Sequence, residues 1–105
     1  MPSFNFESAG EIIRVNFGRD ISAGTSFKMT LEPQQNGSAA DVAPTLGTSK
    51  VVVDDEVYEA NQYIEYTILA ATFIKKTSGR WRKKGVATLA SQTIATDYSF
   101  FRVMP

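Results

Sequence analysis

The sequence predicts an all-β protein, an antiparallel β-sandwich of about seven short strands, on three observations. Apolar and polar residues alternate in several short segments, which is the two-residue repeat of a strand with one face in water. Turn-forming residues recur between these segments, and no stretch carries the repeat of a long amphipathic helix. Many short strands at this spacing are typical of a sandwich or a small barrel.

The first ten residues differ in composition from the rest of the chain. Phe4 and Phe6 stand there among polar neighbours, so we predict that residues 1–10 form an edge strand or an arm that docks on a neighbour. Residues 11–105 have the length of one domain with one core. They show no internal repeat, and we predict a single sandwich domain.

Alternation within that domain predicts strands in four segments, which are IRVNF at 13–17, TSFKMTLEP at 25–33, YIEYTI at 63–68 and FFRV at 100–103. Turn residues separate the strands, at 18–20, 33–37, 54–56, 78–79 and 91–92. Residues 36–44 are rich in Gly, Ser and Ala, which predicts a mobile loop. Residues 70–76 fit a single helical turn that crosses from one sheet to the other.

The chain contains no cysteine and no histidine. Their absence excludes disulfide scaffolds, zinc sites built on these residues, thiol nucleophiles and catalytic relays that need an imidazole base. The acidic stretch Asp54-Asp55-Glu56 lacks the oxygen spacing and the glycine of a hand-type calcium loop, so we interpret it as a charged hairpin tip. We therefore expect no enzyme activity, no bound metal and no cofactor.

Nothing in the sequence predicts a membrane segment. The longest apolar run, ILAATFI at 68–74, is far shorter than the roughly 20 residues of a spanning helix. The first residues lack the basic and apolar regions of a signal peptide. We expect a soluble protein that is made in the cytoplasm.

The segment KKTSGRWRKK at 75–84 holds six of the eleven basic residues and the only tryptophan. Basic residues around an aromatic ring are typical of single-stranded nucleic-acid binding, but the formal net charge of the chain is zero. Five of the eleven acidic residues lie within 54–65. The favoured interpretation is therefore that the opposite charges pair, either across neighbouring strands or between subunits, or that the lysines are simply solvated. Nucleic-acid binding stays the alternative.

These charges supply most of the candidate contact residues. The basic candidates are Lys75, Lys76, Arg80, Arg82, Lys83 and Lys84. The acidic candidates are Asp54, Asp55, Glu56 and Glu59, and the aromatic candidates are Phe4 and Phe6. Trp81 is predicted to anchor the core between the sheets, since a lone tryptophan buries well when its ring nitrogen finds a partner.

The second half also carries an ordered set of features. Leu46-Gly47 precedes a valine strand, QYIEY follows at 62–66, Gly79-Arg80-Trp81 opens a later strand, and FRV at 101–103 closes an aromatic one. This order resembles small immunoglobulin-like domains of tailed-bacteriophage structural proteins, particularly tail, baseplate and adaptor components. The resemblance covers residues 25–105 and implies an immunoglobulin-like sandwich that works inside a virion.

Arg82-Lys83-Lys84-Gly85 departs from that pattern by interrupting the apolar alternation after Trp81. Strict alternation with Trp81 facing in would turn Lys83 inward, which is costly for an unpaired charge. We therefore predict a bulge near Lys84-Gly85 that restores the register and keeps both lysines in water.

Taken with the resemblance, these features lead us to expect a non-enzymatic virion protein of the tail, baseplate or fibre-attachment complex. It would assemble in many copies through contacts with itself and with other virion proteins. A capsid decoration or head-completion protein is the alternative within that class. A single-stranded nucleic-acid-binding barrel that uses Trp81 and residues 75–84 is the alternative outside it. Four tyrosines with Phe100 could also form a glycan-binding face: Tyr58, Tyr63, Tyr66 and Tyr98.

Overall fold

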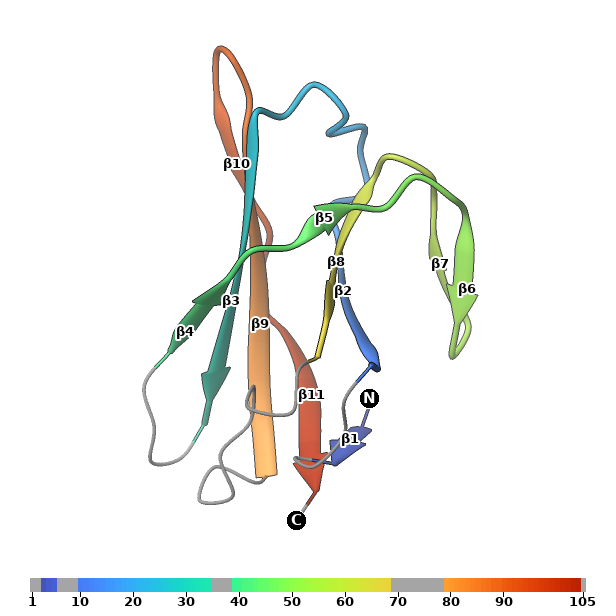
Figure 1. The fold of residues 1–105 in the computed structure, drawn as a ribbon, viewed down its shortest axis with the longest axis vertical. Coiled ribbons are helices and arrows are strands. Elements are labelled where there is room, and N and C mark those ends of the chain that lie inside the picture. Colours follow the sequence, from blue (N-terminus) through green and yellow to red (C-terminus); the bar gives the residue numbers. More distant parts are fainter. Residues whose placement is uncertain (1–2, 6–9, 35–38, 69–78, 105) are drawn as a thin grey trace.

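A computed structural model describes residues 3–5, 10–34, 39–68 and 79–104, and these residues form a β-sandwich (Figure 1). The all-β prediction is therefore confirmed, although the strands are shorter and more numerous than the expected seven. They are β1 (Ser3–Asn5), β2 (Ile12–Asn16), β3 (Ser26–Pro33), β4 (Ala40–Val42), β5 (Thr45–Leu46), β6 (Val51–Val53), β7 (Glu56–Tyr58), β8 (Tyr63–Thr67), β9 (Gly79–Thr88), β10 (Thr93–Ala95) and β11 (Ser99–Met104). No helix among these residues is long and apolar enough to cross a membrane.

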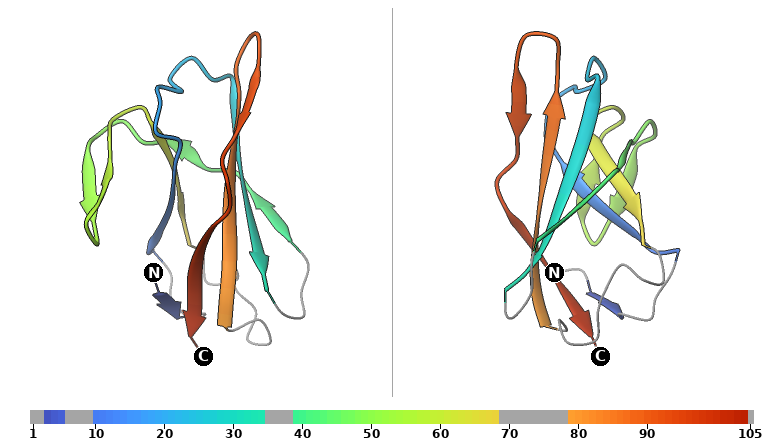
Figure 2. Two further views of the ribbon diagram at one scale, coloured as in Figure 1. Left: turned by 180° about the vertical axis from the view of Figure 1, so that it is seen from behind. Right: turned by 60° about the vertical axis from the view of Figure 1, so that its left-hand side comes forward.

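Two sheets form the two layers of the sandwich, and the right-hand view of Figure 2 shows one layer beside the other. The large sheet has the order β1-β11-β9-β3-β4, with β10 also paired to β9. The small sheet has the order β2-β8-β5, and β6 and β7 form a separate two-stranded hairpin. All pairs are antiparallel except β1 with β11. The predicted helical turn at 70–76 lies outside the described residues.

The predicted bulge in β9 is wrong. β9 pairs with β3 without interruption, from Ser26 opposite Thr88 to Pro33 opposite Trp81. The extra residue lies instead in the segment that joins β10 to β11. Ala95 pairs with Val86 and Ser99 pairs with Lys83, so three residues, 96–98, lie opposite only two residues of β9, Lys84 and Gly85. The alternation of β9 therefore continues through the basic segment, and Lys83 faces inward with Trp81.

Two hydrogen bonds hold this bulge against β9. The backbone N–H of Thr96 donates to the carbonyl oxygen of Gly85 at 2.9 Å, and the N–H of Gly85 donates to Thr96 Oγ1 at 3.0 Å. A Cβ on Gly85 would lie 3.0 Å from the side chains of Phe17 and Val15. The glycine thus lets the small sheet approach β9 closely beside Lys83.

The hydrophobic core lies between the two sheets and draws on both. Trp81 belongs to it with 5% of its surface exposed, and its ring centroid lies 5.8 Å from that of Phe101. The alternating residues predicted to face inward are buried or packed against the core, namely Ile13, Val15, Phe17, Phe27, Met29, Leu31, Ile64, Tyr66, Ile68, Phe101 and Val103. The period-two pattern thus placed the core correctly.

Two sequence predictions concern β1 and β4, the edge strands of the large sheet. Phe4 lies on β1, an edge strand parallel to β11, and its ring packs edge-on against Phe101 at 5.7 Å. The expectation of a loop over 36–44 is wrong for 40–42, which form β4 on the edge of β3. The hydroxyl of Thr30 donates to Asp41 Oδ1 at 2.7 Å across this pair. Contacts between Asp41 and β3 hold β4 in the large sheet, although the composition of residues 36–44 is typical of a loop.

Candidate functional site

Three of the predicted contact residues lie together on the outer face of the large sheet. Arg80, Arg82 and Lys84 alternate along β9 with the inward-facing Trp81 and Lys83. Successive side chains of a strand point to opposite faces, so these three cations share the face that points away from the small sheet. The sequence therefore brings them together through strand periodicity alone.

Two aromatic rings lie beneath these cations. The guanidinium carbon of Arg80 lies 4.0 Å from the ring centroid of Phe100, and that of Arg82 lies 3.9 Å from the centroid of Tyr98. Lys84 Nζ lies 5.5 Å from the same Tyr98 centroid. Cations at such distances are attracted to the ring faces, which holds their long side chains in place.

We call this surface the basic–aromatic face, and it consists of Arg80, Arg82, Lys84, Tyr98, Phe100 and Arg102. Its charges are unevenly compensated. Arg82 pairs with Glu32 on β3, whereas Arg80 and Arg102 stand directly opposite one another across β9 and β11. Neither of these two arginines has an ion pair among the described residues. Like charges that face each other across strands are destabilising, so this part of the face gains from an acidic partner.

The predicted acidic contacts gather on the β6–β7 hairpin. Asp54 and Asp55 form its two-residue turn, with φ values of 51° and 66° that correspond to a type I′ turn. Glu56 begins β7, and none of the three carboxylates has an ion pair within the described residues. Glu59 lies beyond the hairpin, exposed, with its Oε1 4.0 Å from Lys50 Nζ.

We call residues 51–58 the acidic hairpin, and it also exposes apolar surface. Val52 is 60% exposed and Val57 is 42% exposed. The hairpin is fastened to the body of the sandwich by Asn16, whose Nδ2 donates to the carbonyl oxygen of Val57 at 3.0 Å. Tyr58 is buried against Tyr63, with ring centroids 5.4 Å apart. The base of the hairpin is therefore fixed while its tip projects (Figure 1).

The two charged surfaces lie on different sides of the molecule. In Figure 2 the hairpin lies on the side of the small sheet, whereas the basic–aromatic face is the outer face of the large sheet. A single copy therefore cannot bring its own acidic hairpin onto its own basic–aromatic face. Contact between these surfaces requires two copies.

Lys83 does not belong to the basic–aromatic face, and the expectation that it stays in water is wrong. Lys83 is only 5% exposed, and its Nζ donates to the carbonyl oxygen of Arg14 at 2.5 Å. Burial lowers the pKa of Lys83 to about 8, an effect that the Glu56 carboxylate opposes and the Arg14 guanidinium reinforces. Backbone oxygens at a strand edge can thus hold a buried ammonium that alternation forces inward.

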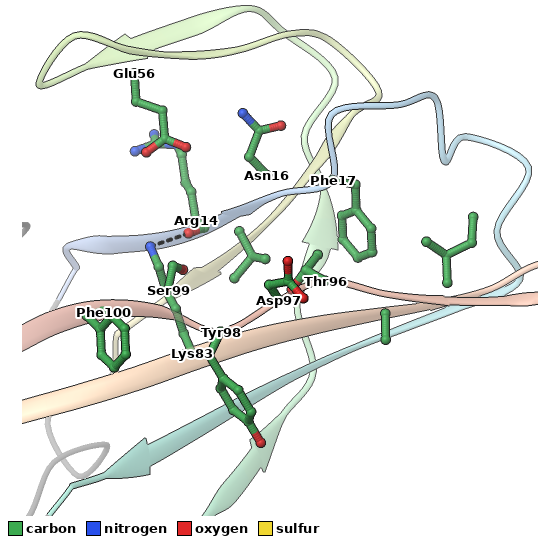
Figure 3. Close-up of a pocket in the computed structure, with 13 residues that line it drawn as sticks. Arg14, Asn16, Phe17, Glu56, Lys83, Thr96, Asp97, Tyr98, Ser99 and Phe100 are labelled. Atoms are coloured by element: carbon green, nitrogen blue, oxygen red, sulfur yellow. Dashed lines mark hydrogen bonds between the residues drawn. The ribbon is translucent and has the colours of Figure 1, made fainter.

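The Nζ of Lys83 borders a cleft of about 490 Å³ between the two sheets (Figure 3). We call it the inter-sheet cleft. Residues of β2 line one side, and the segment 94–100, which contains the bulge, lines the other. Figure 3 shows the lysine reaching from β9 toward β2, with Ser99 beside it. The bulge and the missing Cβ of Gly85 both shape this space.

The remaining predicted site residues do not join either surface. Trp81 and Phe4 pack in or against the core, and Lys75, Lys76 and Phe6 lie outside the described residues. The tyrosines do not form one glycan-binding face. Tyr58 and Tyr63 are buried, and the hydroxyl of Tyr63 donates to the carbonyl oxygen of Ser49 at 2.7 Å, whereas Tyr98 is 41% exposed.

Sequence reasoning missed that Tyr98, Phe100 and Arg102 belong with the basic residues. The signal was present, since FFRV places Phe100 and Arg102 on the face opposite Phe101 and Val103. The register of β11 on β9 was not readable, because the bulge at 96–98 shifts it by one residue.

The described residues contain no group of three or more Asp and Glu side chains arranged to hold a metal ion. Comparison with known protein families, with curated proteins and with solved structures found no match to this chain.

Proposed function

We propose that this chain is a non-enzymatic structural protein of a tailed-bacteriophage virion, a tail, baseplate or fibre-attachment component that assembles in many copies. The resemblance of residues 25–105 to immunoglobulin-like domains of such proteins motivates the virion assignment. What supports an assembly role is the pair of complementary surfaces on one small sandwich. The basic–aromatic face and the acidic hairpin carry opposite charges and lie on different sides.

The observation that carries this proposal is the uncompensated charge on each surface. Arg80 and Arg102 stand opposite each other, and neither forms an ion pair among the described residues. The carboxylates of Asp54, Asp55 and Glu56 likewise form no ion pair there. Each surface also offers exposed apolar groups. Tyr98 belongs to the basic–aromatic face, and Met104 lies next to it on the same side of β11 as Arg102, whereas Val52 and Val57 belong to the acidic hairpin. A contact between them would bury apolar area and pair the charges, which favours both specificity and association rate.

Such a contact is heterologous, because different surfaces of the two copies meet. Repetition of a heterologous contact produces a closed ring or an open filament, depending on the rotation between copies. The proposed role needs many copies in a symmetric assembly, and a heterologous contact that closes into a ring supplies one. A capsid decoration or head-completion protein would use the same surfaces, and the position of the chain on the particle separates these two roles.

A nucleic-acid-binding function is the second candidate, and the basic–aromatic face is the observation that favours it. Trp81 cannot serve as its stacking platform because the ring is buried. Tyr98 and Phe100 would replace it, yet Arg82 and Arg80 already stack on these rings. A fluorescence titration with a labelled oligonucleotide at low salt tests this candidate, and absence of salt-dependent binding removes it.

Mass spectrometry and electron microscopy of purified virions from the phage that encodes the chain test the leading proposal. The expected result is a fixed stoichiometry of this protein, with labelled antibody located on the tail or baseplate. Label on the shell would instead assign the capsid role. Particles that lack the protein entirely would refute a virion function.

A further inference from the structure

We propose that the inter-sheet cleft is a binding site for a carboxylate group, with the ammonium of Lys83 as its anchor. The cleft shares Glu56 with the acidic hairpin and Tyr98 and Phe100 with the basic–aromatic face, but its anchor Lys83 belongs to neither surface. The proposal does not depend on the virion assignment.

Lys83 has fewer hydrogen-bond partners than a buried ammonium requires. An ammonium group has three N–H donors and no acceptor. One donor is used by the carbonyl oxygen of Arg14 at 2.5 Å, and no other described residue accepts from Nζ. Buried charges in proteins are normally paired and hydrogen-bonded. Two donors of a residue that is 5% exposed are thus left for something that enters the cleft.

Other donors surround this ammonium. Ser99 stands directly opposite Lys83 in the β9–β11 register, so its hydroxyl lies on the same face. Thr96 Oγ1 accepts from the Gly85 N–H, which leaves the Thr96 hydroxyl hydrogen as a donor within the lining. The Arg14 side chain is not one of these donors, because its Nε is ion-paired with Glu65 at 3.6 Å. A cleft rich in unused donors selects a ligand with acceptor oxygens.

The charges at the opening favour a monoanion over a more highly charged group. Glu56 and Asp97 also line the cleft, and both residues are exposed, so they lie where it meets solvent. These carboxylates would repel a phosphate dianion more strongly than a carboxylate. A carboxylate has two acceptor oxygens and one negative charge, and its bond to a lysine would be charge-assisted. The cleft is large enough for a side chain or a small acid, at about 490 Å³.

Such a carboxylate could belong to a free small acid or to an Asp, a Glu or a chain terminus of a polypeptide. The test titrates folded protein with sodium acetate in one arm and with a capped Gly-Asp-Gly peptide in the other. The capped Gly-Asn-Gly peptide is the control for the second arm. Lysine side-chain NMR signals and the amide signals of Thr96 and Ser99 report on the cleft.

We expect saturable shifts of the Lys83, Thr96 and Ser99 signals that are lost in Lys83→Met and retained in Lys28→Met. Lys28 is the matched control because it lies exposed on the other face of the large sheet. A response to acetate assigns the site to free acids, and a response to the aspartyl peptide alone assigns it to polypeptides. No saturable shift in either arm, or equal shifts in Lys83→Met, overturns the proposal.

A second measurement uses the unmodified protein and so does not depend on the folding of a variant. The ionisable groups around Lys83 are Arg14 from β2, Asp54 and Glu56 with Tyr58 from the β6–β7 hairpin, and Asp97 before β11. Because the pKa of Lys83 is about 8, its charged fraction falls about tenfold between about pH 7 and about pH 9. Carboxylate affinity should weaken about tenfold over this range. An affinity that stays constant would contradict the role of Lys83.

Discussion

Replacement of Lys83 by methionine tests whether alternation has truly driven a lysine into the core. Methionine has nearly the same length, carries no charge and adapts to irregular core space. Burial lowers the pKa of Lys83 from 10.5 to about 8 in the folded protein. Between these values the unfolded chain binds more protons than the folded one, so raising the pH favours folding.

The magnitude follows from the two pKa values. Integrating the proton linkage for this single group gives a rise in the free energy of unfolding of about 2 kcal/mol between about pH 7 and about pH 9.5. Burial and Glu56 raise the pKa of Tyr58 to about 12, so this tyrosine loses stabilisation only above about pH 10. The chosen range therefore separates Lys83 from Tyr58.

Urea unfolding followed by tryptophan fluorescence at several pH values provides the assay. Wild-type protein and Lys28→Met should gain about 2 kcal/mol more than Lys83→Met as the pH rises through this range. Lys28 is exposed, so its replacement controls for the loss of a lysine as such. Identical pH dependence of wild type and Lys83→Met would refute the burial of Lys83.

Three further variants test the packing and the turn. Gly47→Ala should destabilise the fold by at least about 2 kcal/mol in urea unfolding, since a Cβ there would lie 2.0 Å from the ring of Tyr63; an unchanged midpoint would contradict this contact. Trp81→Ala should cost about 3–5 kcal/mol, and wild-type tryptophan emission should be blue-shifted and shift to the red on unfolding; exposed-type emission in folded protein would place the ring in solvent. Replacing Asp54-Asp55 by Asn-Gly should stabilise the type I′ turn by about 1 kcal/mol, measured as a higher unfolding midpoint; a lower midpoint would argue against positive φ at both positions.

Sequence periodicity predicted the core because burial on one face of a strand leaves a direct two-residue signal. Ile13, Met29, Ile64 and Phe101 were all identified in this way. The same periodicity also indicated that Lys83 would face inward. The bulge was predicted in the wrong strand because a buried lysine without a partner is costly. The sequence does not show that the Lys83 ammonium has a partner, the carbonyl oxygen of Arg14.

The rest of the site depends on contacts between distant segments. No local pattern indicates that Arg80 stacks on Phe100 or faces Arg102, because the register of β11 depends on the extra residue at 96–98. The inter-sheet cleft likewise needs β2 beside the bulge, a contact between residues about 80 positions apart in the chain. The turn at Asp54-Asp55 was predictable since it is local.

Sedimentation velocity with charge-exchanged variants tests most directly whether the two charged surfaces join copies of the chain. One variant reverses the basic–aromatic face with Arg80→Glu and Arg102→Glu. The other changes the acidic hairpin with Val52→Lys, Asp54→Asn and Asp55→Asn, because asparagine tolerates positive φ. We predict that wild-type protein self-associates at low salt and that each variant alone remains monomeric. An equal mixture of the two variants should form dimers, because the first variant keeps an intact acidic hairpin and the second keeps an intact basic–aromatic face. Each variant should lose binding to wild type at the surface it alters. Wild-type protein that remains monomeric up to millimolar concentration, or variants that assemble as the wild type does, would contradict this account.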